Sequence, residues 1–334
     1  MMSKKPAELL DECLWALYTP SKPKLKRFFS LGGNELPMLA KLFRSPLFGP
    51  ALQAAASQCA HGKARLSLAW VDKRPVAAVA GVRRTEYGDL AIFRIHGYRK
   101  SDGCADFNSR CLLIQAKIAK EKNQIANPCV PINPTKPRTG SSTEREFNLL
   151  SNWPEHDMYE YGASGTPIAT KLNVPNACAW YMATPRKPIS PPATSWRSPW
   201  MCAPVAKGAK CDVTLGELMA AFLSNTSVTR PSTYSQEIVG AGFHLNIGEF
   251  HKSAAPTSVG WDRICMEILR GMRGFNLPKF LTGGTATSGI KTIKLYASPI
   301  EPLYEMAVRG WEYLRRHFGH SKMLVVVVSS YTDG

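Results

Sequence analysis

Hydrophobic and polar positions follow two different periods along this chain, and the change between them divides its first half. Up to residue 60 the apolar residues recur every three or four positions, which indicates amphipathic helices over 6–17, 35–43 and 50–57. From residue 65 the pattern changes to alternation and to short apolar runs, which predicts strands. These strands cover residues 65–71, 75–82, 89–97 and 110–118. We expect them to form an antiparallel meander after a helical start.

The second half of the chain is less regular at first and then returns to periodic patterns. Residues 155–211 hold many Pro, Ser and Thr with interspersed Trp and Tyr, which predicts irregular loops. The aromatic residues either stack on nucleobases or form a small satellite core under those loops. Helices are predicted at 214–223, where Thr214 and Glu217 form a capping box, and further on at 261–273 and 301–318.

The last apolar run, 323–328, is a nearly unbroken series of Val, which predicts a strand buried on both faces inside a sheet. Together these patterns predict an α+β protein. We divide it into a helical start with an α-β core (1–154) and a loop-rich helical extension (155–334). The final strand favours an extension that is continuous with the core.

Charge and cysteine content limit the partners and the compartment. The chain has 42 Lys and Arg against 25 Asp and Glu, a formal net charge of +17 at pH 7. Such an excess attracts polyanions, so we expect nucleic acid as the partner, with an anionic membrane surface as the alternative. There is no apolar run long enough to span a membrane, and the charged N-terminus lacks the apolar core of a signal peptide. Nine scattered cysteines without a C-x-x-C pair predict a reduced, cytoplasmic protein.

Polar side chains interrupt the two apolar runs that flank a Gly/Asp/Asn-rich turn near residue 103. Asp89 starts the first run, and Gln115 and Lys117 lie near the end of the second. In an antiparallel hairpin centred there, opposite positions sum to about 206, which puts Asp89 opposite Lys117 with Gln115 on the same face. A carboxylate and an amide oxygen suit a hard cation such as Mg²⁺ or Mn²⁺, and the lysine can hold phosphate or orient water. The alternative is an ordinary cross-strand ion pair at a sheet end.

An Asp at a strand start followed by Gln-Ala-Lys in the next strand resembles the PD-(D/E)XK nuclease superfamily. It is most similar to the Mrr-type branch, in which Gln replaces the second acidic residue. The resemblance rests on a small part of the chain, and Gly88 stands where the pattern has Pro. It implies a restriction-endonuclease-like core, a mixed sheet flanked by helices. In this core Asp89 and Gln115 bind the metal and Lys117 is the catalytic lysine. The implied function is a metal-dependent endonuclease acting on DNA, in bacterial restriction or anti-phage defence.

Other acidic residues compete for a place in this site. Glu86 adds a second carboxylate if the strand begins with a bulge and is otherwise a surface residue. Asp106 also fits a looser spacing, but the hairpin places it in the turn, more than ~20 Å along the strand from Gln115. The resemblance further implies an acidic residue on the helix before the sheet, for which Glu35 and then Glu12 are the candidates. It also implies a helix after the second strand, for which we take 143–152.

The basic, proline-rich stretch after the second strand supplies the predicted nucleic-acid contacts, which are Lys120, Lys122, Lys136 and Arg138. Two further hypotheses stay open at this point. One is a nucleic-acid-binding module with a degenerate nuclease core, since an amide binds Mg²⁺ more weakly than a carboxylate does. The other is a structural subunit of a nucleoprotein complex. The sequence does not decide between a homo-oligomer and a complex with other proteins.

Overall fold

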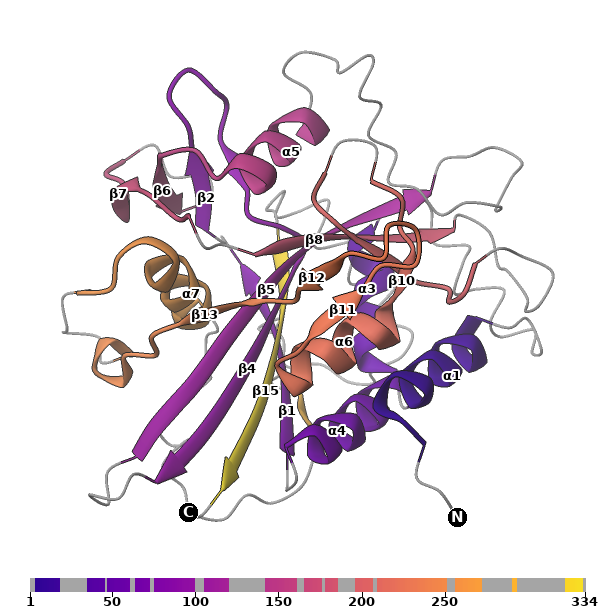
Figure 1. The fold of residues 1–334 in the computed structure, drawn as a ribbon. Helices are drawn as coiled ribbons and strands as arrows, with labels where there is room; N and C mark the ends of the chain where they lie inside the picture. The colour runs from indigo at the N-terminus through magenta and orange to yellow at the C-terminus, as the bar shows by residue number, and fades with distance from the viewer. Residues whose placement is uncertain are drawn as a thin grey trace, which may run out of the picture.

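A long hairpin of strands β4 (Leu90–Arg99) and β5 (Ala105–Ala119) forms the centre of a mixed nine-stranded sheet (Figure 1). The structure is a computed structural model. It describes residues 4–18, 35–45, 47–60, 64–72, 75–99, 105–119, 142–160, 165–175, 178–185, 196–206, 209–250, 256–271, 290–292 and 322–332. The predicted α+β class, with a mixed sheet flanked by helices, is confirmed.

Seven more strands complete this sheet around the hairpin. In spatial order it runs β10 (Val213–Thr214), β9 (Met201–Pro204), β8 (Ala179–Pro185), β5, β4, β15 (Lys322–Thr332), β1 (Ala64–Asp72) and β14 (Ile290–Thr292), with β13 (Ala241–Phe243) also paired to β5. β4 and β5 are antiparallel, whereas β5 and β8 are parallel. The sheet therefore takes strands from both predicted stretches, 1–154 and 155–334.

The predicted four-stranded meander is wrong, because β15 lies between β4 and β1. β15 runs parallel to β4 and antiparallel to β1, and its Met323–Val328 segment is buried (Figure 1). The prediction of a strand inside a sheet is thus confirmed. A run of β-branched residues without Gly or Pro suits a fully covered central strand.

The segment 75–82 forms only the short strand β2 (Pro75–Ala78), which belongs to a second sheet. A turn follows at Gly81, whose φ of +72° an L side chain rarely adopts. The second sheet has the order β3 (Thr85–Glu86), β2, β6 (His156–Glu160) and β7 (Ala169–Leu172). The predicted irregularity of 155–211 is therefore also wrong, because this stretch contains β6, β7, β8 and β9.

Helices cover both faces of the large sheet. Leu14, Leu52 and Phe222 lie in one buried cluster with Ile92 and Ile114 of the hairpin. The helices on that side are α1 (Pro6–Tyr18), α3 (Glu35–Arg44), α4 (Phe48–Cys59) and α6 (Leu215–Ser224). These helices confirm the predicted helical start and the helix at 214–223.

The opposite face carries α5 (Ser142–Asn152) and α7 (Gly260–Arg270) (Figure 1). Leu149 and Ile264 pack there with Phe93 and Leu113, because alternate residues of a strand point to opposite faces. The predicted helix after the second hairpin strand is confirmed in α5. Within the described ranges, no helix is long and apolar enough to cross a bilayer. The predicted helix 301–318 lies outside those ranges.

A satellite core lies beside α5, as one of the two interpretations of the aromatic residues predicts. Phe147 of α5 packs there with Tyr181 of β8, Met201 of β9 and Trp196. Trp196 is buried in this core, as Trp180 and Trp200 are in the main one. These tryptophans are core residues rather than exposed stacking platforms.

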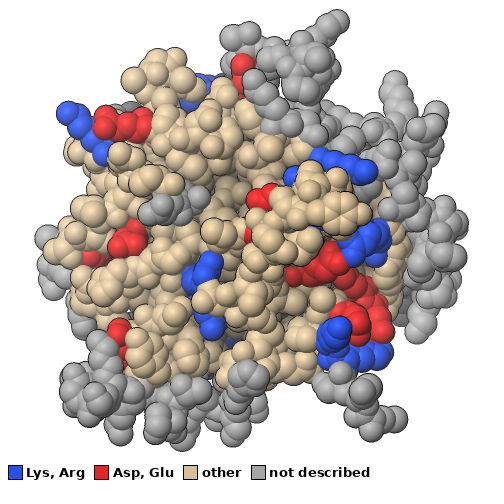
Figure 2. Space-filling view, in the orientation of Figure 1, with Lys and Arg blue, Asp and Glu red and all other residues tan. Residues whose placement is uncertain are grey.

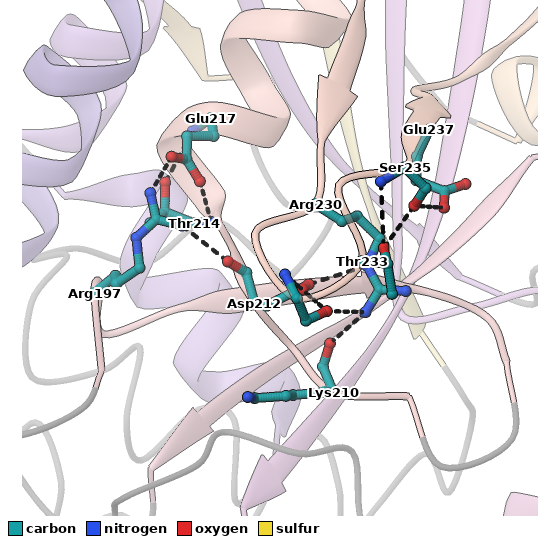
Figure 3. A network of polar contacts seen from close by, with 10 residues as sticks. Arg197, Lys210, Asp212, Thr214, Glu217, Arg230, Thr233, Ser235 and Glu237 are labelled. Carbon is teal, nitrogen blue, oxygen red and sulfur yellow. Dashed lines mark hydrogen bonds and ion pairs between the residues drawn. The ribbon is translucent and has the colours of Figure 1, made fainter.

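A polar network joins β10, α6 and the hairpin of β11 (Ser227–Thr229) and β12 (Gln236–Ile238) (Figure 3). Arg230 Nε and the backbone N–H of Ser232 donate to the Asp212 carboxylate over 3.0 and 2.9 Å. Arg197 donates to the Asp212 carbonyl and to Glu217, which closes the capping box with Thr214. The predicted capping box is confirmed, and the network fixes the N-terminus of α6. Further along the chain, residues Ile247–Phe250 form the 3₁₀ turn η1.

Candidate functional site

Asp89 is fixed by its backbone between two strands of the large sheet. Its N–H donates to the Ile114 carbonyl of β5 over 2.9 Å, and its own carbonyl accepts from the Leu324 N–H of β15 over 3.0 Å. The residue is 7% exposed. Its Oδ2 accepts hydrogen bonds from the Ala116 N–H (3.0 Å) and from Gln115 Nε2 (2.5 Å). The carboxylate is therefore held in one orientation at the end of the hairpin.

The predicted pairing of Asp89 with Lys117 is wrong by two residues. Paired positions such as Leu90 and Ile114 sum to 204 rather than 206, so Asp89 lies opposite Gln115. The turn is centred one residue earlier than the composition of the loop indicates. A shift of two residues keeps the face, because side chains alternate with period two. Asp89, Gln115 and Lys117 thus lie on the same face, the one that carries α5.

The residue before Asp89 has a backbone conformation that proline cannot adopt. Gly88 has a φ of +146°, and a Cβ built on it would lie 3.0 Å from the Ile114 carbonyl oxygen. Proline fixes φ near −65°, and any L side chain is strained at a positive φ. The departure from the Pro-Asp pattern therefore has a local cause, the close approach of Gly88 to β5.

Lys117 forms a buried ion pair with Glu146 of α5. Nζ and Oε2 are 2.5 Å apart, and the two side chains are only 13% and 11% exposed. Burial lowers the pKa of Lys117, but the charges of Glu146 and Asp89 and the hydrogen bond to Glu146 raise it above its ordinary value. The ammonium therefore stays charged beside Asp89.

Two carboxylates outside the hairpin act on this lysine. Glu35, the first residue of α3, makes the smallest contribution to the raised pKa of Lys117 through its charge, and its role in the site stays a prediction. Glu146 is missing from the sequence-based set. A signal was present, because Glu146 lies on the same helical stripe as the buried Leu149 and Leu150.

Gln115 contributes a buried oxygen that lacks a partner. The residue is 4% exposed, and its Oε1 accepts no hydrogen bond from any described residue. Leaving such an atom unpaired costs about 1–3 kcal/mol. Its register partner on β8, Tyr181, has a buried hydroxyl that likewise lacks a partner within the described ranges. Two unpaired polar atoms thus lie on neighbouring strands at the Asp89 end of the hairpin.

This donor set fits a hard divalent cation. Asp89 supplies a carboxylate and Gln115 an amide oxygen, which are oxygen ligands of the kind that Mg²⁺ and Mn²⁺ prefer. A half-turn of the Gln115 amide about its last side-chain bond brings Oε1 in place of Nε2 toward Asp89. The set includes only one hairpin carboxylate. Consistently, the described residues contain no group of three His, Cys, Asp or Glu side chains placed to hold a metal ion.

The other predicted residues fall elsewhere. Glu86 lies in β3 of the smaller sheet, where it pairs with Val76. Asp106 lies at the turn end of the hairpin, far along the strand from Gln115, as predicted when Asp89 was preferred to it. There its Oδ2 accepts a 3.0 Å hydrogen bond from Tyr98. Glu12 pairs with Lys4 on the surface of α1. The predicted nucleic-acid contacts Lys120, Lys122, Lys136 and Arg138 lie outside the described residues.

A buried hydrogen-bond chain lies next to the site. The Tyr87 hydroxyl, fully buried two residues before Asp89, is 2.7 Å from His156 Nε2. His156 Nδ1 is 2.7 Å from the Pro154 carbonyl, which can only accept a hydrogen bond, so Nδ1 carries the proton and Nε2 accepts from Tyr87. Burial lowers the pKa of His156. The chain joins the entry of β4 to the segment that follows α5.

The excess of positive charge is concentrated outside the described residues. Within them, basic and acidic side chains are nearly equal in number, and Figure 2 shows both kinds interspersed on one face. A separate hollow of about 490 Å³ lies between β7 and the start of α7. Asp89, Gln115 and Lys117 are not among the residues that line it. The buried Arg263 in its lining is paired with Glu267 and the Ile168 carbonyl.

Comparisons of the chain with protein families, with curated proteins and with solved structures found no match. The resemblance to the PD-(D/E)XK superfamily therefore stays a prediction. The site stands on its own geometry, which is a fixed carboxylate, an amide with an unpaired oxygen and an ion-paired lysine on one face of a hairpin.

Proposed function

We propose that this protein is a metal-dependent nuclease whose site is formed by Asp89, Gln115 and Lys117. The observation that carries the proposal is the unpaired Gln115 Oε1, buried beside a carboxylate that is itself buried and oriented by two hydrogen bonds. Buried polar atoms are nearly always paired, and an unpaired one is explained by a ligand, an ion, an ordered water or a catalytic role. With the amide turned so that Oε1 faces Asp89, the hydrogen bond from Nε2 is replaced by a divalent cation between the two oxygens, while the Ala116 N–H still orients the carboxylate.

Each residue has a role that follows from its surroundings. A bound Mg²⁺ ion supplies Lewis-acid polarisation of a phosphate oxygen and a lowered pKa for water. The Ala116 N–H keeps the Asp89 carboxylate facing the hairpin end, and Gln115 offers a neutral oxygen. The charged Lys117 orients water or stabilises the negative charge that develops on the phosphate. Glu146 keeps Lys117 in place through the ion pair.

The substrate class follows from charge. A net charge of +17 favours a polyanion, and binding to a phosphate backbone through many Lys and Arg weakens steeply with salt. DNA is proposed first because the resemblance implies it. Restriction or anti-phage defence as the biological setting rests on the resemblance alone.

A cleavage assay tests the proposal on plasmid DNA, linear DNA, single-stranded DNA and RNA, with Mg²⁺, Mn²⁺ or EDTA. The variants are Asp89→Asn and Lys117→Met, with Asp106→Asn as the control. Asp106 undergoes the same chemical change as Asp89 at the opposite end of the same hairpin. We expect metal-dependent cleavage that is lost in the first two variants and kept in the control. Equal activity in Asp89→Asn and the wild type would refute the site.

A second candidate function is a nucleic-acid-binding module without cleavage. It is favoured by the single carboxylate at the Gln115 end of the hairpin and by the ion pair in which Glu146 already engages Lys117. This function predicts salt-dependent binding that is the same in wild type, Asp89→Asn and Lys117→Met, with no cleavage in any metal. The assay above separates the two functions when binding is measured on the same samples.

A further inference from the structure

Tyr181 is a buried residue of β8, and packing alone does not explain why its ring carries a hydroxyl. Its side chain is 0% exposed and packs with Phe147 and Trp196, yet its hydroxyl finds no hydrogen-bond partner among the described residues. An unpaired buried hydroxyl destabilises a fold by about 1–3 kcal/mol, whereas phenylalanine fills the same volume without that cost. We therefore look for a hydrogen-bond partner of this hydroxyl among molecules that bind to the protein.

The position of Tyr181 relates it to the candidate site. Tyr181 is the register partner of Gln115 on the parallel neighbour strand, and adjacent strands lie ~4.8 Å apart. Both side chains lie on the face that carries α5, and the charge of Glu146 acts on Tyr181. The unpaired Gln115 oxygen and the unpaired Tyr181 hydroxyl thus lie on neighbouring strands and on the same face of the sheet.

The protonation state of Tyr181 is set by the same surroundings. Burial, with a smaller contribution from Glu146, raises the pKa of Tyr181 far above its ordinary value. The phenol is therefore neutral at any working pH and has a proton to donate. A neutral phenol donates its strongest hydrogen bonds to charged acceptors, and the oxygens of a phosphate are of that kind.

We infer that the Tyr181 hydroxyl donates a hydrogen bond to a non-bridging oxygen of the substrate phosphate held at the Asp89–Gln115 site. This inference rests on the proposed nuclease function, because it assigns a phosphodiester to that site. Tyr181 is a phosphate-contacting residue, and no bond to it forms or breaks. A donor whose side chain is held in place by packing stabilises the negative charge that develops on the phosphate in the transition state.

The test compares Tyr181→Phe with Tyr234→Phe, which removes the same hydroxyl from a side chain that is 84% exposed. Cleavage kinetics, thermal midpoint and the Mg²⁺ concentration at half-maximal activity are measured for both variants and the wild type. Removing one preorganised donor lowers kcat by about 100-fold in comparable sites, and we expect a loss of that order in Tyr181→Phe. We expect an unchanged Mg²⁺ midpoint and a thermal midpoint equal to or above that of the wild type. Tyr234→Phe should match the wild type.

Two results would overturn the inference. If Tyr181→Phe lowers the thermal midpoint together with activity, the hydroxyl has a structural partner. If Tyr181→Phe cleaves like the wild type, the hydroxyl does not contact the reacting phosphate.

A wild-type protein that cleaves nothing would contradict the proposed function, and the inference is then decided by binding. The probe is a short fluorescein-labelled single-stranded oligonucleotide in Ca²⁺. Weaker binding by Tyr181→Phe than by Tyr234→Phe supports the phosphate contact, and equal binding refutes it.

Discussion

Tyr87 and His156 are joined by a buried hydrogen bond of 2.7 Å although 69 residues separate them. Tyr87 precedes Asp89 by two residues, and His156 follows α5, the helix that carries Glu146. The bond therefore ties together the two segments that bring Asp89 and Glu146 to the site. Because His156 must be neutral to accept from Tyr87, this tie depends on pH.

The first prediction concerns this pH dependence. Burial lowers the pKa of His156 in the folded protein, so below about pH 6.5 the unfolded state binds more protons and the free energy of unfolding decreases. We expect the free energy of unfolding, measured by urea titration, to fall as pH drops from about 7 to about 5, by at most ~1.4 kcal/mol per pH unit for one group. His156→Gln should flatten this slope.

His96 provides the comparison for that experiment. Burial and the charge of Arg94 also lower its pKa, and it pairs with Ser330 away from Tyr87. His96→Gln should remove a separate part of the slope and leave cleavage unchanged. If His156→Gln keeps the full wild-type slope, the Tyr87–His156 bond does not titrate in this range.

The second prediction concerns the Lys117–Glu146 pair. Glu146→Leu leaves a buried ammonium without its partner, and Lys117→Met leaves a buried carboxylate. Each single change should destabilise the fold by about 3 kcal/mol, whereas the double variant should lose less than the sum. Urea unfolding of the four proteins measures the coupling. Additive losses would mean that the ion pair contributes no net coupling.

The same pair predicts behaviour at high pH. The pKa of Lys117 is raised in the folded state, so its stabilising contribution is complete below the unfolded value of about 10.4 and is lost as pH rises through the folded value. The wild type should therefore lose stability above that pH more steeply than Lys117→Met does. Equal slopes would indicate that Lys117 titrates alike in both states.

The third prediction concerns the glycine before Asp89. In Gly88→Ala the new Cβ meets the Ile114 carbonyl at 3.0 Å in a conformation that L side chains rarely adopt, so we expect a loss of about 2–3 kcal/mol and reduced metal binding. Gly165→Ala is the control, because a Cβ there meets nothing within 4 Å. Thermal midpoints and Mn²⁺ titration of both variants check this. Equal midpoints would show that β5 accommodates the methyl group.

The fourth prediction concerns Asp212, which holds the β11–β12 hairpin (Figure 3). Burial raises its pKa, but hydrogen bonds from Ser232 and the nearby Arg230 outweigh burial and lower it. Asp212→Ala should cost about 2–3 kcal/mol and reduce the amide-exchange protection of Tyr234, whose N–H donates to the Arg230 carbonyl. The wild-type contribution should be complete above the unfolded pKa of about 3.9 and be lost as pH falls through the lowered pKa of the folded state.

The control for this prediction is Glu237→Gln on the same hairpin. Glu237 accepts a hydrogen bond only from the Ser235 hydroxyl among the contacts shown in Figure 3. Glu237→Gln should therefore leave the amide hydrogen exchange of Tyr234 near the wild-type rate. An equal loss of protection in both variants would show that the hairpin is not anchored through Asp212.

Local patterns in the sequence were sufficient for the hairpin and for the face of its polar residues. Alternation fixes which side of a strand a residue occupies, so Asp89, Gln115 and Lys117 share a face even though the predicted register was wrong by two. Register depends on the turn, whose composition allows more than one centre. The helices at 6–17 and 214–223 followed from periodicity and capping signals.

Those local patterns could not predict which residues and strands from distant parts of the chain contact one another. Nothing local to Val325 states that it pairs with Ala91, and nothing local to Tyr181 states that it lies beside Gln115. Strand order is decided by which runs bury the most apolar surface together, a property of the whole chain. The position of Glu146 on the buried stripe of its helix was a local signal, but its partner Lys117 lies on a different element and does not follow from that signal.

The insertion of β15 between β4 and β1 has a consequence for the order of assembly during synthesis. Leu324 pairs with Leu90 and Val328 with Leu66, so contacts at the middle of the sheet join segments more than two hundred residues apart. Closing so large a loop is entropically costly, and topologies rich in distant pairings fold slowly. The carbonyl of Asp89 receives its hydrogen bond from Leu324, so the strand end that holds this carboxylate is completed only after β15 has been made. A nascent chain that lacks β15 therefore exposes the edges of β4 and β1, and chaperones that shield such edges should bind it until the last strand arrives.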